Sequence, residues 1–167
     1  LVIQGNYIGT GLDGTTAFGN GTTGVEFTSA GGNTTLGGAG AGEGNIIANN
    51  IEDGVRLGTD VSNYSVRILS NSIHSNGFGI DIDDDVVTAN DSGDGDIGAN
   101  ALQNFPIITI ATVGGNDVIG TLNSTASTAF TLQFFSNTAC DGSGNGQGRT
   151  FIGSTDVTTD GSGNASF

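Results

Sequence analysis

Short clusters of apolar, β-branched residues recur along this chain, separated by stretches rich in glycine and asparagine. Ile46-Ile47, Val66-Arg67-Ile68 and Ile107-Ile108-Thr109-Ile110 are typical clusters; they are too short for amphipathic helices and consist largely of strand-favouring residues. The chain contains 31 glycines, and glycine and asparagine between strands favour tight turns because both adopt positive φ readily. The pattern therefore predicts an all-β protein with dense turns.

The apolar clusters of the first half form an internal repeat. Residues 1–8 align without gaps on residues 66–73, and residues 45–50 align on residues 71–76. Each copy continues into glycine, a β-branched residue, a polar residue and another apolar residue. These continuations are Gly24-Val25-Glu26-Phe27, Gly54-Val55-Arg56-Leu57 and Gly79-Ile80-Asp81-Ile82. A unit of three short strands thus occurs three times, and the first two copies carry loop insertions, over residues 10–23 and over residues 29–32 with 37–44.

Stacking the copies on one another fits their alternation better than folding them into hairpins, because the connecting turns lack the two-residue form that closes hairpins. The stack predicts three apolar columns: Ile3 with Ile68, then Ile8, Ile47 and Ile73, then Val25, Val55 and Ile80. We expect the last column to be buried and its neighbours Glu26, Arg56 and Asp81 to be exposed. Such a stack of coils is a solenoid.

Equivalent asparagines fall at one turn of the repeat. Asn6, Asn45 and Asn71 occupy this position in the three copies. Stacked side-chain amides can donate and accept hydrogen bonds along a column. We therefore expect a structural asparagine ladder along the solenoid.

The turn motifs of the repeat follow one another in a fixed order. They are Gly5-Asn6-Tyr7-Ile8-Gly9, Gly32-Asn33-Thr34-Thr35-Leu36-Gly37 and Gly44-Asn45-Ile46-Ile47-Ala48-Asn49-Asn50. This series resembles the right-handed parallel β-helix of the pectate-lyase-like superfamily, and within it a group of secreted bacterial β-helix repeat proteins. The resemblance covers roughly residues 1–105, and the segment Leu102-Gln103-Asn104-Phe105-Pro106 at its end also recurs in that group. It implies a right-handed parallel β-helix of about three coils in a secreted or cell-surface protein.

A second region follows Pro106, the only proline of the chain, which marks a boundary at residues 105–106. The alternating segments beyond it predict strands of a small antiparallel β-sandwich over residues 106–167. The predicted strands are 107–113, 117–123, 128–136, 150–158 and 165–167. This region resembles the immunoglobulin-like module that follows the β-helix in the same group, with its last strands missing.

The charge balance limits the partners of the chain. Seventeen carboxylates against three arginines give a formal net charge of −14. A basic face is needed to bind phosphate, so nucleic acid and anionic membrane surfaces are excluded as partners. The sequence also holds no apolar run long enough to span a membrane. A divalent cation is the partner that this balance favours.

An acidic segment at residues 81–96 is the candidate metal site. Its oxygen-bearing residues are Asp81, Asp83, Asp84, Asp85, Asn90, Asp91, Asp94 and Asp96. Calcium takes six to eight such oxygen ligands with loose geometry, and so many unpaired carboxylates would repel one another without a cation. The segment therefore predicts a structural Ca²⁺ ion between the last coil and the sandwich. The alternative is a solvated acidic loop, since the spacing departs from the EF-hand pattern.

The acidic residues are compatible with catalysis or with a structural role. Polysaccharide lyases of this fold use calcium-bound carboxylates with a basic residue, and Arg56 and Arg67 are the only arginines of the β-helix region. An outward pair between Arg56 and Asp81 on adjacent coils is better explained as a cross-strand ion pair. A glycoside hydrolase needs two carboxylates with separated pKa values, and nothing in the sequence separates those of Asp81 and Asp83. The balance favours a protein that is not an enzyme.

Three functions remain open from the sequence. The preferred hypothesis is a non-catalytic extracellular surface module, a stalk or adhesin-like protein stabilised by calcium. The second is a polysaccharide-active or carbohydrate-binding β-helix. The third is a subunit of an extracellular fibre, in which copies associate end to end by strand donation. The motivation is that residues 1–4 begin inside a predicted strand, while the sandwich stops at Phe167 after a turn that should lead into another strand.

Overall fold

The computed structural model describes residues 1–29, 34–59, 64–112 and 117–167. The protein is all-β, as predicted, and its one helical segment is the short 3₁₀ helix η1 (Ala99–Leu102) among the described residues. Gly32 and Asn33 of the second turn motif, and Val113 at the end of a predicted strand, lie outside the described residues. No helix in the described part of the chain is long and apolar enough to cross a membrane.

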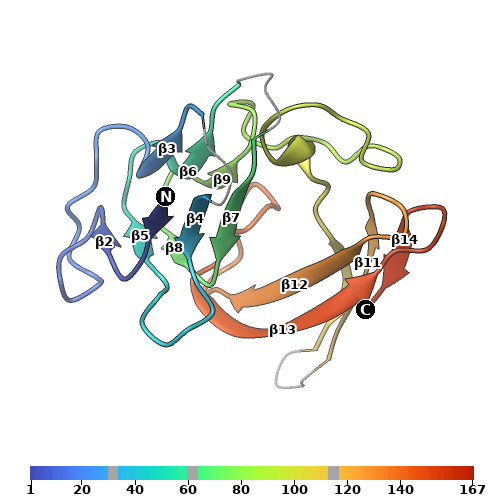
Figure 1. The fold of residues 1–167 in the computed structure, drawn as a ribbon. Helices are drawn as coiled ribbons and strands as arrows, with labels where there is room; N and C mark the ends of the chain where they lie inside the picture. Colours follow the sequence, from blue (N-terminus) through green and yellow to red (C-terminus); the bar gives the residue numbers. More distant parts are fainter. Residues whose placement is uncertain (30–33, 60–63, 113–116) are drawn as a thin grey trace.

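Nine short strands of the first half form three parallel sheets (Figure 1). The first sheet contains β1 (Val2–Ile3), β4 (Thr34–Gly37) and β7 (Val66–Leu69); the second contains β2 (Tyr7–Ile8), β5 (Ile46–Ala48) and β8 (Ser72–His74); the third contains β3 (Val25–Phe27), β6 (Asp53–Leu57) and β9 (Phe78–Asp81). The chain passes through the three sheets in the same order three times, and each such passage is one visit. Each visit adds one strand beside the strand of the previous visit.

The register of these sheets agrees with the predicted stacking. Val25 lies opposite Val55 and Val55 opposite Ile80, while Ile47 lies between Ile8 and Ile73. Strand β5 pairs with β2 and β8, and β6 pairs with β3 and β9, so the hairpin alternative is wrong. The apolar side chains of the middle visit form the core, since Leu36, Ile47, Val55 and Leu57 are fully buried.

The third column departs from the prediction at its last member. Ile80 is 45% exposed, whereas Asp81 is 3% exposed, so both predictions for this pair of residues are wrong. Two local causes account for the reversal. Strand β9 is the last of its sheet, so no further strand covers Ile80, and the carboxylate of Asp81 is enclosed by the backbone that follows it. In the other two strands of this sheet, Glu26 is exposed as predicted and Val55 is fully buried, whereas Arg56 and Val25 are only half-buried.

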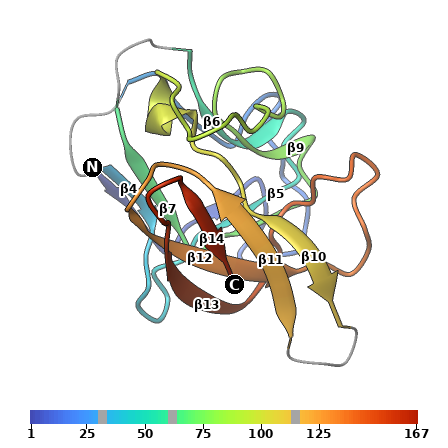
Figure 2. The ribbon, with the colours of Figure 1, turned by 90° about the vertical axis from the view of Figure 1, so that its right-hand side faces the viewer.

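The second half of the chain forms two small antiparallel sheets (Figure 2). One contains β10 (Ile107–Ala111), β11 (Val118–Asn123) and β14 (Asn164–Ser166), and the other is the hairpin of β12 (Ala129–Ser136) and β13 (Thr150–Thr158). Few large side chains are buried here: Leu122 and Leu132 are inside, while Ile107, Ile108 and Ile110 of β10 remain more than half exposed. The two sheets therefore form a small, open antiparallel module.

Candidate functional site

Hydrogen-bonded asparagines run along the stack of strands at the turn after the first sheet. The backbone N–H and Nδ2 of Asn6 both donate to Oδ1 of Asn45, each over 3.0 Å. Asn45 repeats the pattern on Oδ1 of Asn71, with distances of 3.0 and 2.8 Å. Asn45 and Asn71 are buried, so these bonds satisfy polar groups that water does not reach. These three residues are those of the predicted ladder.

A second ladder, missed in the sequence, follows the turn between the second and third sheets. The backbone N–H and Nδ2 of Asn20 donate to Oδ1 of Asn50 over 3.1 and 3.0 Å. Asn50 donates in the same way to Asn76, over 3.0 and 2.8 Å. Asn50 and Asn76 are equivalent in the repeat alignment, which was a usable signal. Asn20 lies in the insertion over residues 10–23, where the alignment gives no equivalent position.

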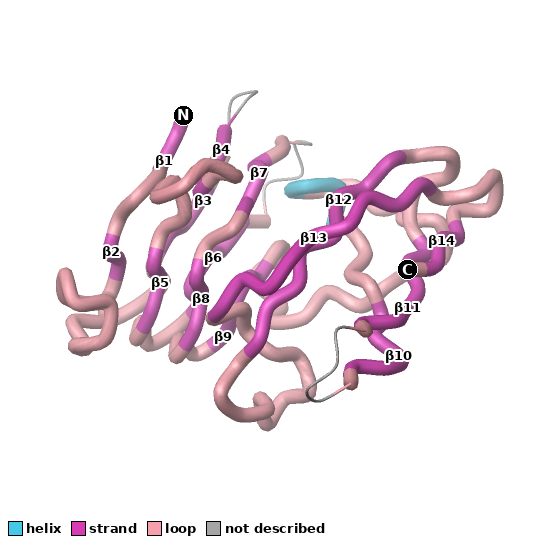
Figure 3. The backbone as a smooth tube through the Cα atoms, turned by 90° about the horizontal axis from the view of Figure 1, so that it is seen from below, coloured by secondary structure: helices cyan, strands magenta, loops and turns pink. Residues whose placement is uncertain are grey.

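A glutamine of the antiparallel module extends the second ladder by one step. Oε1 of Gln147 accepts the backbone N–H of Asn76 over 3.1 Å and its Nδ2 over 3.2 Å, and Nε2 of Gln147 donates to the Asn76 carbonyl over 2.8 Å. The next residue, Gly148, accepts the N–H of Ile73 in β8 over 2.8 Å. Residues 147–149 thus cover the outer edge of β8 in the way a further strand would (Figure 3).

Replacing Gln147 by alanine is expected to lower the free energy of unfolding by about 1–3 kcal/mol, because the two Asn76 donors lose their acceptor in a largely buried position. Urea denaturation followed by circular dichroism measures the change. Asn145→Ala is the matched control, since this asparagine is exposed in the same loop, and it should change stability by less than about 0.5 kcal/mol. Equal effects of the two variants would contradict the capping role of Gln147.

The acidic segment is divided into two groups that have different partners. In the first group, Asp81 is buried and its carboxylate accepts the backbone N–H groups of Asp83, Asp85 and Val86 over 3.0–3.2 Å. These three donors satisfy the oxygens of a carboxylate that water barely reaches. Asp81 therefore holds the turn after β9, and Oδ1 of Asp85 accepts a hydrogen bond from the Thr88 hydroxyl in the same turn.

Arg56 balances part of the first group. Its guanidinium contacts Asp53 at 2.6 Å, Glu52 at 3.0 Å and Asp84 at 3.3 Å. Burial alone would lower the pKa of Arg56, but the hydrogen bond and charge of Asp53, with Asp84 and Glu52, raise it above its ordinary value. The predicted ion pair between Arg56 and Asp81 is wrong. Asp81 is instead occupied by backbone N–H groups, and the partner from the next visit is Asp84.

The second group ties the acidic loop to the antiparallel module. Asp94 accepts the backbone N–H of Asn104 over 2.8 Å and the Ser124 hydroxyl over 2.6 Å. The Asn104 side chain donates to the carbonyl of Asp91 and also to that of Asn123 at the end of β11. These bonds place the loop against β11.

The remaining predicted ligands are placed less tightly. Asn90 exchanges two hydrogen bonds with the backbone of Phe105, over 2.8 and 2.9 Å, and Asp96 is exposed. In residues 81–96 the two groups do not meet as one cluster. Within the described ranges no three His, Cys, Asp or Glu side chains gather closely enough to hold a metal ion.

One atom of the second group is left without a partner. Oδ1 of Asp91 is buried and accepts no hydrogen bond from the described residues, although Oδ2 of the same carboxylate accepts the N–H of Gly95 over 3.3 Å. A buried, unpaired carboxylate oxygen is costly unless a cation, a water or a donor satisfies it. Its chemistry fits a Ca²⁺ ligand, and Asp94 and Asp96 are the nearest acidic residues along the loop.

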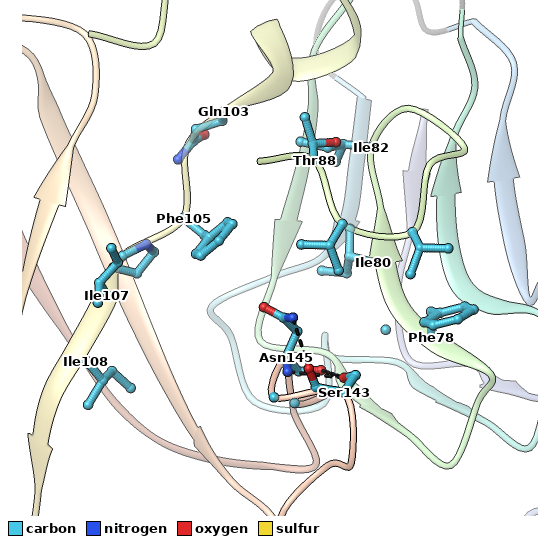
Figure 4. A pocket seen from close by; sticks show the side chains of 16 residues that line it. Phe78, Ile80, Ile82, Thr88, Gln103, Phe105, Ile107, Ile108, Ser143 and Asn145 are labelled. Carbon is cyan, nitrogen blue, oxygen red and sulfur yellow. Dashed lines mark hydrogen bonds between the residues drawn. The ribbon is translucent and has the colours of Figure 1, made fainter. Parts of the chain in front are cut away.

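An apolar cleft lies beside the outer edge of β9. It has a volume of about 630 Å³, and its walls come from β9 and the turn after it, from the start of β10 and from the loop at residues 143–146. Figure 4 shows Phe78, Ile80 and Ile82 on one side, and Phe105, Ile107 and Ile108 on the other. The volume is within the usual range for ligand sites, about 300–1,000 Å³. No sequence pattern indicates this cleft, because its walls come from segments far apart along the chain.

The chain was compared with known proteins. No protein-family model, curated protein or solved structure gives a significant match to it.

Proposed function

We propose that this protein is a non-catalytic structural module of the cell exterior, built as a right-handed parallel β-helix with an immunoglobulin-like module at its end. The observation that carries the proposal is the pair of amide ladders that run through all three visits of the chain, one of which Gln147 extends. These buried amides bond to their equivalents in the neighbouring visit. Such bonds hold the turns together along the stack.

The parallel sheets support the β-helix interpretation. Three sheets receive one strand from each visit, in one order and in register, which is the strand arrangement of a three-sided β-helix. The right-handed sense, the immunoglobulin-like identity and the extracellular location rest on the resemblance to secreted bacterial repeat proteins. The acidic composition, with a net charge of −14, agrees with a module that stays soluble among other surface proteins.

The contacts of the carboxylates favour a structural over a catalytic role. Asp81 accepts three backbone N–H groups, and Asp53 is buried against Arg56. A general acid needs a carboxyl group that faces the substrate. The most buried carboxylates of the first half are instead paired with hydrogen-bond donors, as expected for groups that stabilise turns.

Pulling the protein from its two ends in a single-molecule force experiment tests the structural role. Unfolding should require a lower force in Asn50→Ala than in the unchanged protein, because Asn50 is buried and bonded to both neighbouring rungs. Asn20→Ala is the matched control, since Asn20 is exposed and bonded to one rung only, and it should behave almost like the unchanged protein. Formation of new reducing or unsaturated ends from polygalacturonate, xylan or alginate would overturn the non-catalytic proposal.

Calcium is part of the proposal: the buried Oδ1 of Asp91 is its first ligand, and Asp94 and Asp96, which do not form a metal-holding cluster with it in this structure, would close around the ion. A ligand present at 100 times its Kd stabilises the folded state by about 2.7 kcal/mol. For a chain of this size that change raises the Tm by about 5–10 °C. We therefore expect a rise of this order when CaCl₂ replaces EDTA.

The calcium measurement needs controls for the strong negative charge of the chain. NaCl at the same ionic strength should raise the Tm much less than CaCl₂, since screening alone is not site-specific. Asp91→Asn should remove most of the calcium effect, whereas Asp117→Asn, at an exposed aspartate outside the loop, should keep it. A Tm that is the same in EDTA and CaCl₂ would show that the segment binds no calcium.

A further inference from the structure

The outer edges of the three parallel sheets are covered to different extents. At β7, Oδ1 of Asn100 accepts the Val66 N–H over 2.7 Å and Nδ2 of Asn100 donates to the Val66 carbonyl over 3.0 Å. At β8, Gly148 accepts the Ile73 N–H. At β9, the backbone hydrogen bonds within the described residues all go to β6 and to the turn that precedes β6. The outer edge of β9 therefore lacks a backbone hydrogen-bond partner among these residues, although Gln147 packs close to Gly79 within the strand.

The open edge of β9 faces a second strand edge across the apolar cleft. Strand β10 pairs only with β11, and its Ile107 and Ile108 are 53% and 54% exposed. Figure 4 shows Phe105 and Ile80 on opposite walls of the space. A second hollow of about 580 Å³ shares Ile80, Phe105 and Ile108 with the cleft and reaches Ile68 and Ile73. An apolar surface of this extent is unusual unless something packs on it.

Another segment of the same chain already pairs with this end of the stack, and it indicates what kind of occupant fits the neighbouring edge. Residues 147–149 bond to β8 through the Gly148 carbonyl, while the Arg149 carbonyl accepts the Ser72 hydroxyl over 2.6 Å. The edge of β9 is the neighbouring position around the same end. A small apolar molecule would fill the cleft but leave the strand edge unpaired, whereas an extended peptide would satisfy both.

The negative charge beside the cleft favours extended peptides that carry basic residues. The turn after β9 carries Asp83, Asp84 and Asp85, which are exposed or half-buried, and Arg56 is already paired with Asp53 and Asp84. The whole chain has a formal net charge of −14, so a second copy would approach against electrostatic repulsion. A segment with basic residues would be attracted.

We propose that the edge of β9 binds an extended segment of a partner protein, in which apolar side chains alternate and basic residues flank them. The backbone of the segment pairs with β9, and its apolar side chains pack between Ile80 and Phe105. The basic residues lie toward the aspartates of the turn after β9. This inference does not depend on the calcium site or on the absence of catalysis.

A capped peptide of the sequence Lys-Val-Thr-Val-Thr-Val-Lys is a suitable probe. An environment-sensitive fluorophore on Cys140, the single cysteine of the chain, reports binding because this residue is exposed and precedes the loop that lines the cleft. The lysine peptide should bind at least about tenfold more tightly than the same peptide with glutamates at its ends. It should also bind at least about tenfold more tightly than the peptide with a central proline, which cannot donate to a strand edge.

Two substitutions in the cleft test whether the lysine peptide binds there. Ile80→Asp and Ile108→Asp should each weaken binding of the lysine peptide by at least about tenfold, which corresponds to about 1.4 kcal/mol. Ile51→Asp is the matched control, because this isoleucine is 72% exposed and does not line the cleft, and it should leave the affinity unchanged. Urea denaturation of all three variants establishes that they remain folded.

Several outcomes would overturn the proposal. Binding that is equally tight for the proline peptide would mean that no strand pairing occurs. Affinity unchanged by Ile80→Asp would place the peptide elsewhere. Self-association in size-exclusion chromatography that Ile80→Asp abolishes would assign the cleft to a second copy. Displacement of the peptide by a neutral or acidic polysaccharide would assign it to a carbohydrate.

Discussion

Replacing Gly37 by alanine is expected to destabilise the protein by about 4 kcal/mol or more, a loss comparable with the whole stability of many domains. Gly37 ends β4 with a φ of +84°, and a Cβ atom there would lie 2.0 Å from the carbonyl oxygen of Leu69. The same atom would lie 2.6 and 2.7 Å from the amide atoms of Asn71 in the first ladder. Because backbone and a buried ladder residue both obstruct it, neither neighbour can move without losing hydrogen bonds.

Gly42→Ala is the matched control for this substitution. Gly42 also has a positive φ, +79°, but a Cβ atom there would meet nothing within 4 Å. Its replacement should therefore cost only the left-handed conformation, about 1–2 kcal/mol. Soluble yield and urea denaturation distinguish the two variants. If Gly37→Ala unfolds at the same urea concentration as Gly42→Ala, the close approach of β4 to the next turn is wrong.

The second large effect is expected at the centre of the first ladder. Asn45→Ala should lower the free energy of unfolding by about 2–4 kcal/mol, because it removes an acceptor of two hydrogen bonds and a donor to both Asn71 and the Ile3 carbonyl. Asn45 is 1% exposed, so water does not replace these partners. Thermal and urea denaturation measure the loss.

Asn6→Ala serves as the control for Asn45, since it has the same chemistry at an exposed rung. The backbone N–H of Asn6 still donates to Asn45 after the substitution, so the cost should stay below about 1 kcal/mol. A similar loss at both positions would mean that burial of the ladder does not determine its strength. A small loss at both would mean that the ladder contributes little to stability.

The regular part of this fold is readable from the sequence because repeats constrain register. Ile8, Ile47 and Ile73 align in the chain, and they face one another in the second sheet. Gly37 and its positive φ fall at the end of a strand whose equivalent in the next visit ends at Leu69. Repetition turns weak local signals into a consistent prediction, since each copy must bury the same face.

The irregular end of the stack is less predictable because nothing repeats there. Ile80 follows the same pattern as Val55, yet it is exposed, since no fourth strand packs beside β9. The acidic residues are close in sequence, but backbone N–H groups hold Asp81 while Asn104 and Ser124 hold Asp94. The hydrogen-bond partners Ser124 and Gln147 come from beyond residue 106, and no local sequence pattern predicts these contacts.

The two ladders have a direction. In every amide-to-amide step the donors, a backbone N–H and an Nδ2, belong to the earlier visit of the chain, and the acceptor Oδ1 belongs to the later one. The Nδ2 groups of Asn45, Asn71 and Asn76 also donate to backbone carbonyls of the earlier visit. The end at Asn76 therefore requires an acceptor, which Gln147 supplies through Oε1. The opposite end, at Asn6 and Asn20, presents carbonyl oxygens. The two ends of each ladder are therefore chemically different. A turn inserted in the reverse orientation would place the acceptor oxygens of neighbouring rungs against each other.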